Sequence, residues 1–349
     1  MINIISRAYL SKSAGGPKKV VDNLIKGLDL LGYPYIINKS LDCCGRLYIH
    51  DDACALAEAV KLPADIKIIA GPNLYVLPRH IPKEIDLSRV VYLQPSQWAK
   101  DFWTNFGFNR CPIEIWPTGI DTDDFKSGNG EKKFVLVYFK QREREELDFI
   151  KKTLERKNTE YVVLEYGYYK ESDYKKMLDG AKYIVWLGRQ ESQGIAFEEA
   201  LASGVPALVC DVNRFGQWRA GKKEMAMFTE KENDYGNVTS AHYFDETCGI
   251  KIKDLKDFDG GVDLMNARYQ SFSPRGYILN NLNLKKQSRE LIEFYGKHFN
   301  LNYESGLSEQ ACSSGDWINN SRSRVFRARA RDFLKSARVN LRNLLHEYK

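Results

Sequence analysis

Apolar and polar positions divide the chain into two series of strand-like and helix-like segments. The first series opens with an apolar strand, Ile2 to Ile5, and a polar glycine-bearing loop. From Pro17 the apolar residues recur at helical spacing, and Gly32 suits the C-terminal cap of that helix. Further short apolar segments, read as strands, lie at residues 35–37, 47–49, 66–69 and 90–93. Alternation of strand and helix predicts a mostly parallel α/β sheet.

The second series follows a turn-rich stretch, Trp116 to Phe125, and a Gly/Lys/Asn-rich segment, 126–133. Its expected elements are strands at 134–139, 161–165, 183–187 and 207–210, and helices at 143–156, 172–178 and 195–202. Residues 215–263 have too weak a pattern to assign, and helical character returns at 274–299. We predict two Rossmann-like domains with a linker and a tail, at 1–124, 125–299, 300–320 and 321–349, and we expect the last helix of the second domain to pack back on the first.

Length and composition agree with two globular domains. The chain has 349 residues, of which 43% are hydrophobic and 28% charged, as in soluble enzymes. It has seven cysteines and no C-x-x-C pair, which indicates a reducing, cytoplasmic compartment. We expect neither a signal peptide nor a transmembrane helix, because no apolar run approaches the roughly 18 to 20 residues of a membrane span.

The net charge of +6 is concentrated at the C-terminal end. Residues 321–349 contain nine Lys or Arg and two acids, which leaves the preceding residues close to neutral. Apolar residues in this tail recur near helical spacing among the arginines, so we predict a basic amphipathic helix. We hypothesise that it contacts an anionic membrane; the alternative is docking on the protein itself or on another subunit. We expect no nucleic-acid partner.

The most informative segment is RQESQGIAFEEALASGVPALVCD, Arg189 to Asp211, directly after the apolar strand. Glu191 and Gln193 therefore lie in a loop at the carboxyl end of a strand, where α/β folds bind ligands. Gly194 opens the next helix, whose N-terminal N–H groups suit a diphosphate. Glu191 and Glu199 bracket this phosphate-sized site, and their carboxylates can accept hydrogen bonds from sugar and ribose hydroxyls.

ESQGIAFEEALASGVPALV resembles the E-x7-E signature of retaining glycosyltransferases with the GT-B fold, particularly glycosyltransferase family 4. Glu191 and Glu199 match the two acids, and Gly194, Ala200, Ala202, Gly204 and Pro206 match in place. Ser192 replaces a common glycine. The resemblance implies two Rossmann-like domains that face each other across a cleft, an acceptor domain first and a nucleotide-sugar donor domain second.

Three other segments resemble the same family in the same order. SAGGPKKVVDNLIKGLDLLGY resembles its opening Gly-Gly loop and helix, which assigns Gly15 and Gly16 to the donor phosphates. IEIWPTGIDTDDF resembles its hinge, with Thr118 in place of the customary Asn. FVLVYFKQRE occupies the place of the family's cationic diphosphate contacts, and Lys140 and Arg142 are the nearest cations.

The resemblance also implies contacts to the base and to the sugar. The loop Tyr166 to Tyr169 falls where the family contacts the base, and aromatic stacking on a base is physically reasonable. His50 falls near the family's histidine that approaches the sugar. The predicted catalytic residues are therefore Glu191, His50, Lys140 and Arg142. The predicted donor-binding residues are Gly15, Gly16, Tyr168, Gln193, Gly194, Ile195 and Glu199.

The predicted reaction is transfer of a sugar from a UDP- or GDP-sugar to a glycan or lipid-linked acceptor, with retention of configuration and without a cofactor. We predict no metal site, because Asp121-Thr-Asp123 lies inside the hinge pattern and His50-Asp51-Asp52 lacks a second histidine cluster. A nucleotide-sugar epimerase of the same fold and a non-catalytic membrane-associated partner remain alternatives. A dinucleotide-dependent oxidoreductase would need G-x-G-x-x-G after the first strand, which SAGGPKK lacks.

Overall fold

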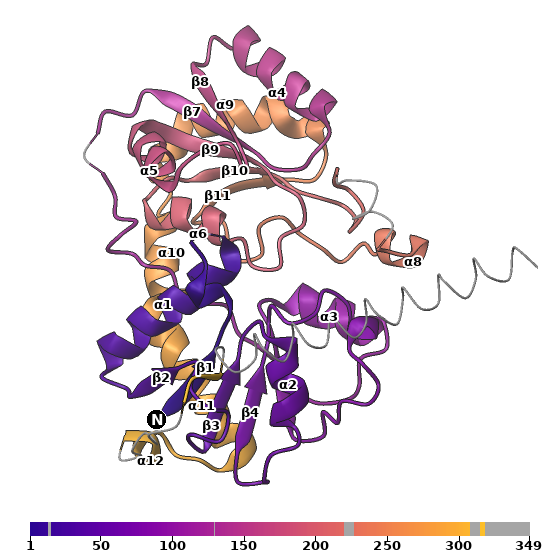
Figure 1. Ribbon diagram of the computed structural model, residues 1–349. Helices are drawn as coiled ribbons and strands as arrows, with labels where there is room; N and C mark the ends of the chain where they lie inside the picture. The colour runs from indigo at the N-terminus through magenta and orange to yellow at the C-terminus, as the bar shows by residue number, and fades with distance from the viewer. Residues whose placement is uncertain (13–14, 129, 220–226, 308–314, 318–349) are drawn as a thin grey trace, which may run out of the picture.

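The computed structural model describes residues 1–12, 15–128, 130–219, 227–307 and 315–317. Its chain forms two lobes, each built on one parallel sheet (Figure 1). In the first lobe the elements are β1 Ile2–Ile5, α1 Gly16–Leu31, β2 Tyr35–Ile37, β3 Arg46–Ile49, α2 Ala53–Ala59, β4 Lys67–Ala70, β5 Val90–Gln94, α3 Gln97–Asn105 and β6 Ile113–Ile115, with short 3-10 turns at Ala8–Leu10 and Pro78–His80.

The second lobe repeats this plan. Its elements are β7 Phe134–Phe139, α4 Arg144–Arg156, β8 Tyr161–Glu165, α5 Glu171–Gly180, β9 Ala181–Leu187, α6 Ile195–Ala202, β10 Ala207–Cys210, α8 Glu230–Asn233, β11 Gly249–Ile252 and α9 Phe258–Arg268. The last helices within the described residues are α10 Pro274–Asn281, α11 Leu284–Phe299 and α12 Tyr303–Leu307. Two 3-10 turns, Leu255–Asp257 and Tyr269–Ser271, flank α9.

Both sheets are parallel throughout, with the orders β2-β1-β3-β4-β5-β6 and β11-β10-β9-β7-β8. Helices cover both faces of each sheet, and the central strands are accordingly apolar on both sides, as in INII and FVLVYF. The α/β fold with two Rossmann-like units is confirmed. Gly32 has a φ of 62° and closes α1 in the left-handed conformation, as predicted for a C-terminal cap.

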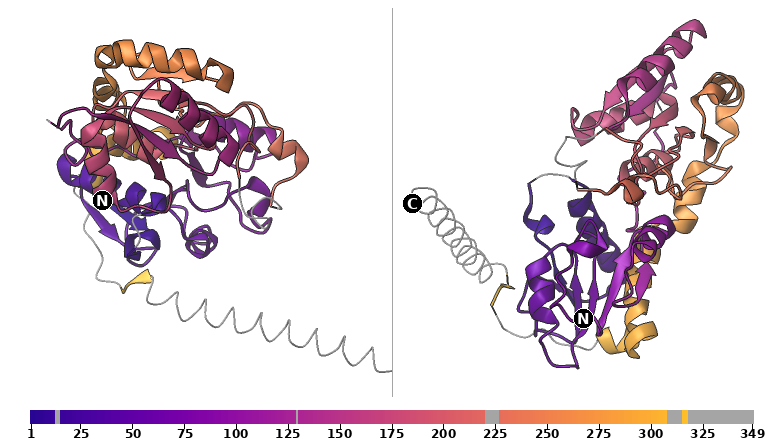
Figure 2. Two further views of the ribbon diagram at one scale, coloured as in Figure 1. Left: turned by 90° about the horizontal axis from the view of Figure 1, so that it is seen from above. Right: turned by 90° about the vertical axis from the view of Figure 1, so that its right-hand side faces the viewer.

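The structure divides the predicted helix 274–299 into two helices that serve different lobes. Leu282 leaves the helical conformation, and the Asn283 side chain caps α11 by accepting a hydrogen bond from the Lys286 N–H at 2.9 Å. Helix α10 packs beside α6 in the second lobe, whereas α11 packs along α1 in the first. In Figure 2 these orange helices run from one lobe to the other. The unassigned stretch 215–263 contains α8, β11 and part of α9, which are short or glycine-bearing.

The contact between α1 and α11 is close because α1 presents a glycine. A Cβ on Gly27 would lie 2.6 Å from the carbonyl oxygen of Leu284, so no larger residue fits without a shift. The Ser288 hydroxyl donates to the Leu24 carbonyl across the same contact at 3.3 Å. Nearby, the Trp116 indole N–H donates to the Gln287 carbonyl at 2.8 Å. This contact therefore joins the C-terminal helix to the first lobe.

A second contact between the lobes lies on the other side of the molecule, where the loop after β10 meets α3. Phe215 packs into the apolar core of the first lobe, and its ring stacks on Phe102 with 4.8 Å between centroids. Buried Glu232 of α8 pairs with Arg79 of the first lobe. The Tyr243 hydroxyl donates to the Pro95 carbonyl at 2.7 Å. The lobes are thus held together on two sides.

Other sequence expectations concern the ends of the chain and the cysteines. The predicted tail helix at 321–349 lies outside the described residues. Within the residues that are described, no helix is both long and apolar enough to cross a membrane. Cys43 is disulfide-bonded, so the seven cysteines are not all free thiols, and the compartment inferred from them stays a prediction.

Replacement of Gly27 tests the contact between α1 and α11. Gly27→Ala should lower the free energy of unfolding by about 1–3 kcal/mol, because overpacking against the Leu284 carbonyl outweighs the roughly 1 kcal/mol that alanine contributes to helix propensity. The matched control is Gly260→Ala in α9, where a Cβ meets nothing within 4 Å, and it should be neutral or stabilising. Urea unfolding of both variants measures the difference; equal stability of both variants would contradict the packing argument.

Candidate functional site

A cavity of about 390 Å³ opens where the carboxyl ends of strands from both sheets face each other. The first lobe contributes loops that follow β1, β4 and β5. The second contributes loops that follow β7, β8 and β9, together with the start of α6. Its walls include Gly15, Gly16, Lys19, Asn73, Lys140, Tyr166, Glu171, Glu191, Gln193, Gly194, Ile195 and Glu199. Loops from two parallel sheets meet at this point because the carboxyl ends of parallel strands share one edge.

Helix α6 points its N-terminus into this cavity. Gly194 precedes the helix with a φ of 98°, a left-handed conformation that side chains other than glycine rarely adopt. The first hydrogen bond of the helix runs from the Glu198 N–H to the Gly194 carbonyl at 3.0 Å, so the N–H groups before Glu198 have no acceptor within the helix. Ile195 and Ala196 line the cavity. An anion at this end would meet backbone donors and the positive end of the helix dipole.

Lys140 and Glu191 form an ion pair in the wall beside that helix end. Lys140 directly follows β7 and Glu191 lies in the loop after β9, and their Nζ and Oε1 atoms are 2.6 Å apart. The Lys140 ammonium also lies 4.4 Å from the ring centroid of Tyr166. The Trp98 indole N–H holds the Glu191 carbonyl at 2.9 Å. The loop with Glu191 is thus positioned by the first lobe.

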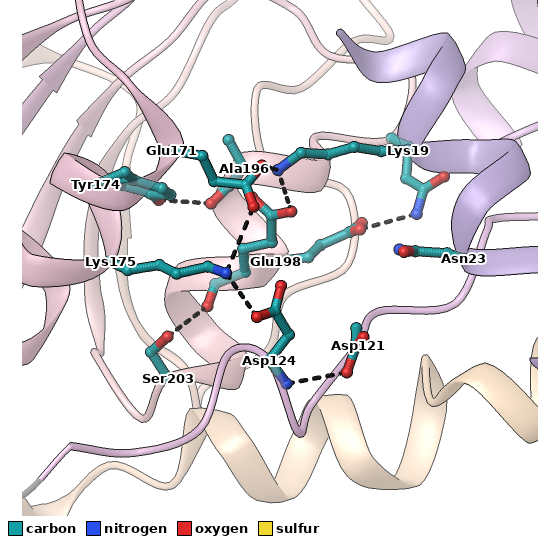
Figure 3. Close-up of polar contacts among 12 residues, drawn as sticks. Lys19, Asn23, Asp121, Asp124, Glu171, Tyr174, Lys175, Ala196, Glu198 and Ser203 are labelled. Carbon is teal, nitrogen blue, oxygen red and sulfur yellow. Dashed lines mark hydrogen bonds and ion pairs between the residues drawn. The ribbon is translucent and has the colours of Figure 1, made fainter. Parts of the chain in front are cut away.

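An ion-pair network of Lys19, Glu171, Lys175 and Asp124 connects the lobes (Figure 3). Lys19 of α1 pairs with Glu199 and lies 3.0 Å from Glu171 of α5. Lys175 extends the network to Asp124 at 2.6 Å. Glu199 is 2% exposed, and its Oε2 atom has no hydrogen-bond partner among the described residues. One acceptor atom of this buried carboxylate is therefore unused among the described residues.

Burial changes the protonation of the two neighbouring acids of α6. Desolvation raises the pKa of Glu199 to about 7, although the Lys19 ammonium lowers it. Desolvation also raises the pKa of Glu198 to about 8, with the Gln193 hydrogen bond acting in the opposite direction. Glu198 is fully buried and does not line the cavity. A neutral carboxyl at Glu198 is the form that this position favours near neutral pH.

The side chain of Gln193 is used to join the two lobes. Its Oε1 atom accepts from the Thr118 N–H at 3.0 Å, and its Nε2 atom donates to the Thr118 carbonyl at 2.9 Å. Nε2 also donates to Glu198 at 2.8 Å. Gln193 lines the cavity, but its amide is engaged with the hinge. A structural role for this side chain therefore accompanies the predicted donor contact.

His50 lies behind the cavity wall. Its ring is fully buried; Nε2 lies 3.0 Å from the Pro17 carbonyl and 3.2 Å from the Asn73 amide nitrogen, and Nδ1 lies 3.1 Å from the Tyr48 hydroxyl. Burial lowers its pKa to about 4, so the ring is neutral at pH 7. His50 supports the two loops at Pro17 and Asn73, while Asn73 itself reaches the cavity.

Two predicted site residues are not brought to the cavity. The Arg142 guanidinium turns away, because it pairs with Glu146 and donates to the carbonyls of Gly188 and Cys210 at 3.0 Å each. The N–H groups of Arg142 therefore find their acceptors at the carboxyl ends of β9 and β10 and on α4. Tyr168 is 85% exposed and lies outside the cavity walls, whereas Tyr166 and Tyr169 of the same loop line it. A glycine at 167 with a φ of 89° turns the loop between them.

Sequence reasoning missed Lys19, Glu171 and Asn73. Lys19 lies one turn into the helix that follows Gly15 and Gly16, and this position in the sequence could have indicated that Lys19 belongs to the site. Glu171 opens α5 as an ordinary first-turn acid, and Asn73 follows a proline in a loop. Neither residue has a pattern in the sequence that would separate it from solvent-exposed polar residues.

The two candidate metal sites have other contacts in the structure. Asp121 accepts from the backbone N–H groups of Asp123 and Asp124 and pairs with Lys26 at 2.6 Å, which closes the hinge turn. Asp52 caps α2 and pairs with Arg7. Over the described part of the chain, no three His, Cys, Asp or Glu side chains gather in a metal-binding arrangement.

Glu198 makes the stability of the protein depend on pH. Its carboxyl is protonated in the folded chain up to a pH of about 8 but ionised in the unfolded chain above about 4.5, so the free energy of unfolding should fall as the pH rises between these values. Since one pKa unit corresponds to about 1.4 kcal/mol, Glu198→Gln should raise the free energy of unfolding at pH 8 by about 2 kcal/mol or more and flatten the profile. Chemical denaturation from pH 4.5 to 8.5 measures this, with Glu145→Gln on exposed α4 as the control. If the free energy of unfolding changed with pH in the same way for the wild type and Glu198→Gln, this account of Glu198 would be wrong.

Comparison with known proteins identifies the fold. No protein-family model matches the chain, and no curated protein sequence matches it. The sucrose-phosphate synthase of Thermosynechococcus elongatus has a similar structure, with a TM-score of 0.57 and 9% identity over 86% of this chain and 99% of that one. The catalytic domain of starch synthase IV from Arabidopsis thaliana, bound to ADP and acarbose, matches with a TM-score of 0.52 and 10% identity. This match covers 86% of this chain and 99% of that one. The lipopolysaccharide outer core galactosyltransferase WaaB matches with a TM-score of 0.50 and 12% identity, and the match covers 85% of this chain and 99% of that one. The two parallel-sheet lobes of this chain have the GT-B fold of these glycosyltransferases.

Proposed function

We propose that this protein is a glycosyltransferase that takes a sugar from a nucleotide-sugar donor, a UDP- or GDP-sugar, and transfers it to a glycan or lipid-linked acceptor. One observation carries the proposal. In a cavity between two GT-B lobes, a helix N-terminus, a lysine and two carboxylates surround a space of about 390 Å³. This volume is within the usual range of ligand sites, about 300–1,000 Å³. The resemblance of Glu191 to Glu199 to the E-x7-E signature of family 4 supports it.

Each part of the cavity suits one part of the donor. The diphosphate would lie at the N–H groups of Ile195 and Ala196, opposite Gly15 and Gly16. Lys140 would neutralise the charge that develops on the leaving nucleoside diphosphate. Glu191 would then accept hydrogen bonds from sugar hydroxyls.

The nucleoside end would lie toward Glu199. The unpartnered Oε2 atom of this carboxylate is a ready acceptor for a ribose hydroxyl. Tyr166 and Tyr169 would lie beside the base, and the ion pair with Lys19 would adjust when the donor binds. The charges in the cavity thus divide into a cationic middle and two acidic ends, as the three parts of a nucleotide sugar require.

In the transfer, the bond between the anomeric carbon and the donor phosphate breaks, and a bond from the anomeric carbon to the acceptor oxygen forms. The acceptor hydroxyl loses its proton to the departing diphosphate. With Lys140 and the backbone donors supplying the stabilisation, we propose a metal-independent reaction. Attack on the face from which the phosphate departs would retain the anomeric configuration, which proton NMR of the first product reads directly.

The donor is identified by a thermal-shift panel of UDP-, GDP- and ADP-sugars, because a ligand at a hundredfold excess over its Kd stabilises the fold by about 2.7 kcal/mol. With the best donor, Lys140→Ala should lower kcat/KM about 100-fold or more, since one lost charge donor to a transition state has this effect. Lys133→Ala, at the exposed opposite end of β7, should keep wild-type activity. Release of nucleoside diphosphate measures both. Stabilisation by no donor, or conversion of the donor to its epimer without transfer, would reject the proposal.

We also propose that residues 321–349 bring the enzyme to an anionic membrane, which rests on the basic amphipathic pattern alone. The full chain should float with vesicles of phosphatidylglycerol and phosphatidylcholine, and a chain ending at residue 320 should not. The binding should weaken at high salt, because the attraction is electrostatic. Equal flotation of the two chains would show that the tail has another use.

A further inference from the structure

A second cavity of about 380 Å³ adjoins the first on the side of the first lobe. The two cavities share part of their walls, so they are neighbours. The shared residues are Pro17, Pro72, Asn73, Pro95 and Ser192. Its volume is within the range of small-molecule sites. A ligand in this second cavity would therefore lie directly beside a donor held in the first.

Aromatic side chains from both lobes make the wall of the second cavity. Trp98, Phe102 and Trp103 come from α3, and Phe215 and Phe228 come from the second lobe. The rings of Phe102 and Phe215 stack with centroids 4.8 Å apart, and those of Phe215 and Phe228 are 4.9 Å apart. Such ring faces are rigid and apolar. A rigid apolar wall of this kind suits the apolar face of a sugar ring better than it suits an extended polar chain.

Three polar groups in the same wall lack partners. Among the described residues, Gln94 Nε2, Gln190 Oε1 and Arg189 Nε are buried with no hydrogen bond. Gln94 and Gln190 are 5% and 4% exposed. Buried polar groups are nearly always hydrogen-bonded, and leaving them unpaired destabilises a protein. Two amides and a guanidinium with unpaired atoms, on three residues that line one cavity, therefore point to a ligand with hydroxyl groups.

Arg189 indicates which charge a ligand of this cavity carries. Its guanidinium lies 4.7 Å from the ring centroid of Trp218, and within the described chain it has no carboxylate partner. It is also the one charged side chain among the described residues that line this cavity. An unpaired guanidinium in an aromatic wall has a fork of donors that matches a carboxylate or a phosphate. A lipid chain in the cavity would leave this cation and both amides unsatisfied.

We propose that the second cavity binds the acceptor as a ring-shaped glycoside that carries a carboxylate or a phosphate group. The anionic group pairs with Arg189, the sugar ring packs on the aromatic wall, and its hydroxyls bond to Gln94 and Gln190. The shared wall at Asn73 and Ser192 then places a free acceptor hydroxyl next to the donor sugar. This inference rests on the proposed function and narrows its acceptor to anionic glycosides.

Ligand-observed saturation-transfer NMR on the full chain tests the proposal with three probes: methyl β-D-glucuronide, glucose 6-phosphate and methyl β-D-glucoside. The two anionic probes distinguish a carboxylate from a phosphate as the preferred group. At least one of them should bind about tenfold or more tightly than the neutral glucoside, because a charge-assisted hydrogen bond contributes about this factor. Binding of all three probes with equal affinity would overturn the proposal.

Substitution of Arg189 shows whether this side chain is the cause. Arg189→Gln should remove the preference for anionic probes, and Arg189→Lys, which keeps the charge but not the fork, should keep more of it for the phosphate than for the carboxylate. The control Arg214→Gln removes an exposed arginine of the loop after β10 that already pairs with Asp234 at 3.4 Å, and it should keep the full preference. Survival of the preference in Arg189→Gln would overturn the proposal.

Binding of the nucleotide separates this inference from the proposed function. UDP or GDP, whichever the panel identifies, should bind the wild type and all three variants with the same Kd, which also shows that the variants are folded. A wild type that binds no nucleotide would reject the proposed function itself. Normal nucleotide binding without any anionic preference would reject the acceptor inference alone.

Discussion

The double hydrogen bond between Gln193 and the backbone of Thr118 is the interaction on which the candidate site depends. Thr118 lies in the first crossing between the lobes, and Gln193 lies in the loop that leads to α6. The amide side chain pairs with both the N–H and the carbonyl of Thr118, much as a neighbouring strand would, and is itself 5% exposed. This contact fixes where Glu191 and Gly194 lie relative to the first lobe.

The electrostatics of the cavity follow from that fixed placement. Lys19, Asp124, Glu171, Lys175 and Glu199 form one ion-pair network between the lobes, and Glu199 is the buried member of this network. Glu199 is nearly inaccessible, yet only one of its oxygens is paired. A buried carboxylate of this kind is costly for stability, as the pKa of about 7 indicates. Such a cost is typical of residues retained for a ligand.

The two adjoining cavities have different characters. The first has charged groups, backbone donors and a helix N-terminus, which suit a charged diphosphate. The second has aromatic walls, two amides and one cation, which suit a ring with hydroxyls. Phe215 and Phe102 close the second cavity from opposite lobes, so its shape depends on how the lobes meet. The fold thus provides two neighbouring volumes with distinct chemistry at the ends of its strands.

Local patterns in the sequence determined the elements and part of the site. The alternation of apolar strands with amphipathic helices predicted the strands of both sheets except the edge strands β6 and β11, because residues buried on both faces of a sheet are mostly apolar. The sequence from Glu191 to Glu199 predicted that a helix begins at Gly194. The structure gives this glycine a φ of 98° directly before α6, a conformation that other residues rarely adopt. Short or glycine-bearing elements between 215 and 263 lack such a pattern.

Only the tertiary structure decided which side chains face the cavity. Lys19 and Glu199 are 180 residues apart, so no local spacing could connect them. Arg142 and Lys140 are two residues apart after one strand, but Arg142 is held by carbonyls of neighbouring strand ends while Lys140 meets Glu191. The direction of a side chain beyond a strand end depends on the groups packed around it. Those groups come from other loops and from the other lobe, and their arrangement exists only once the chain has folded.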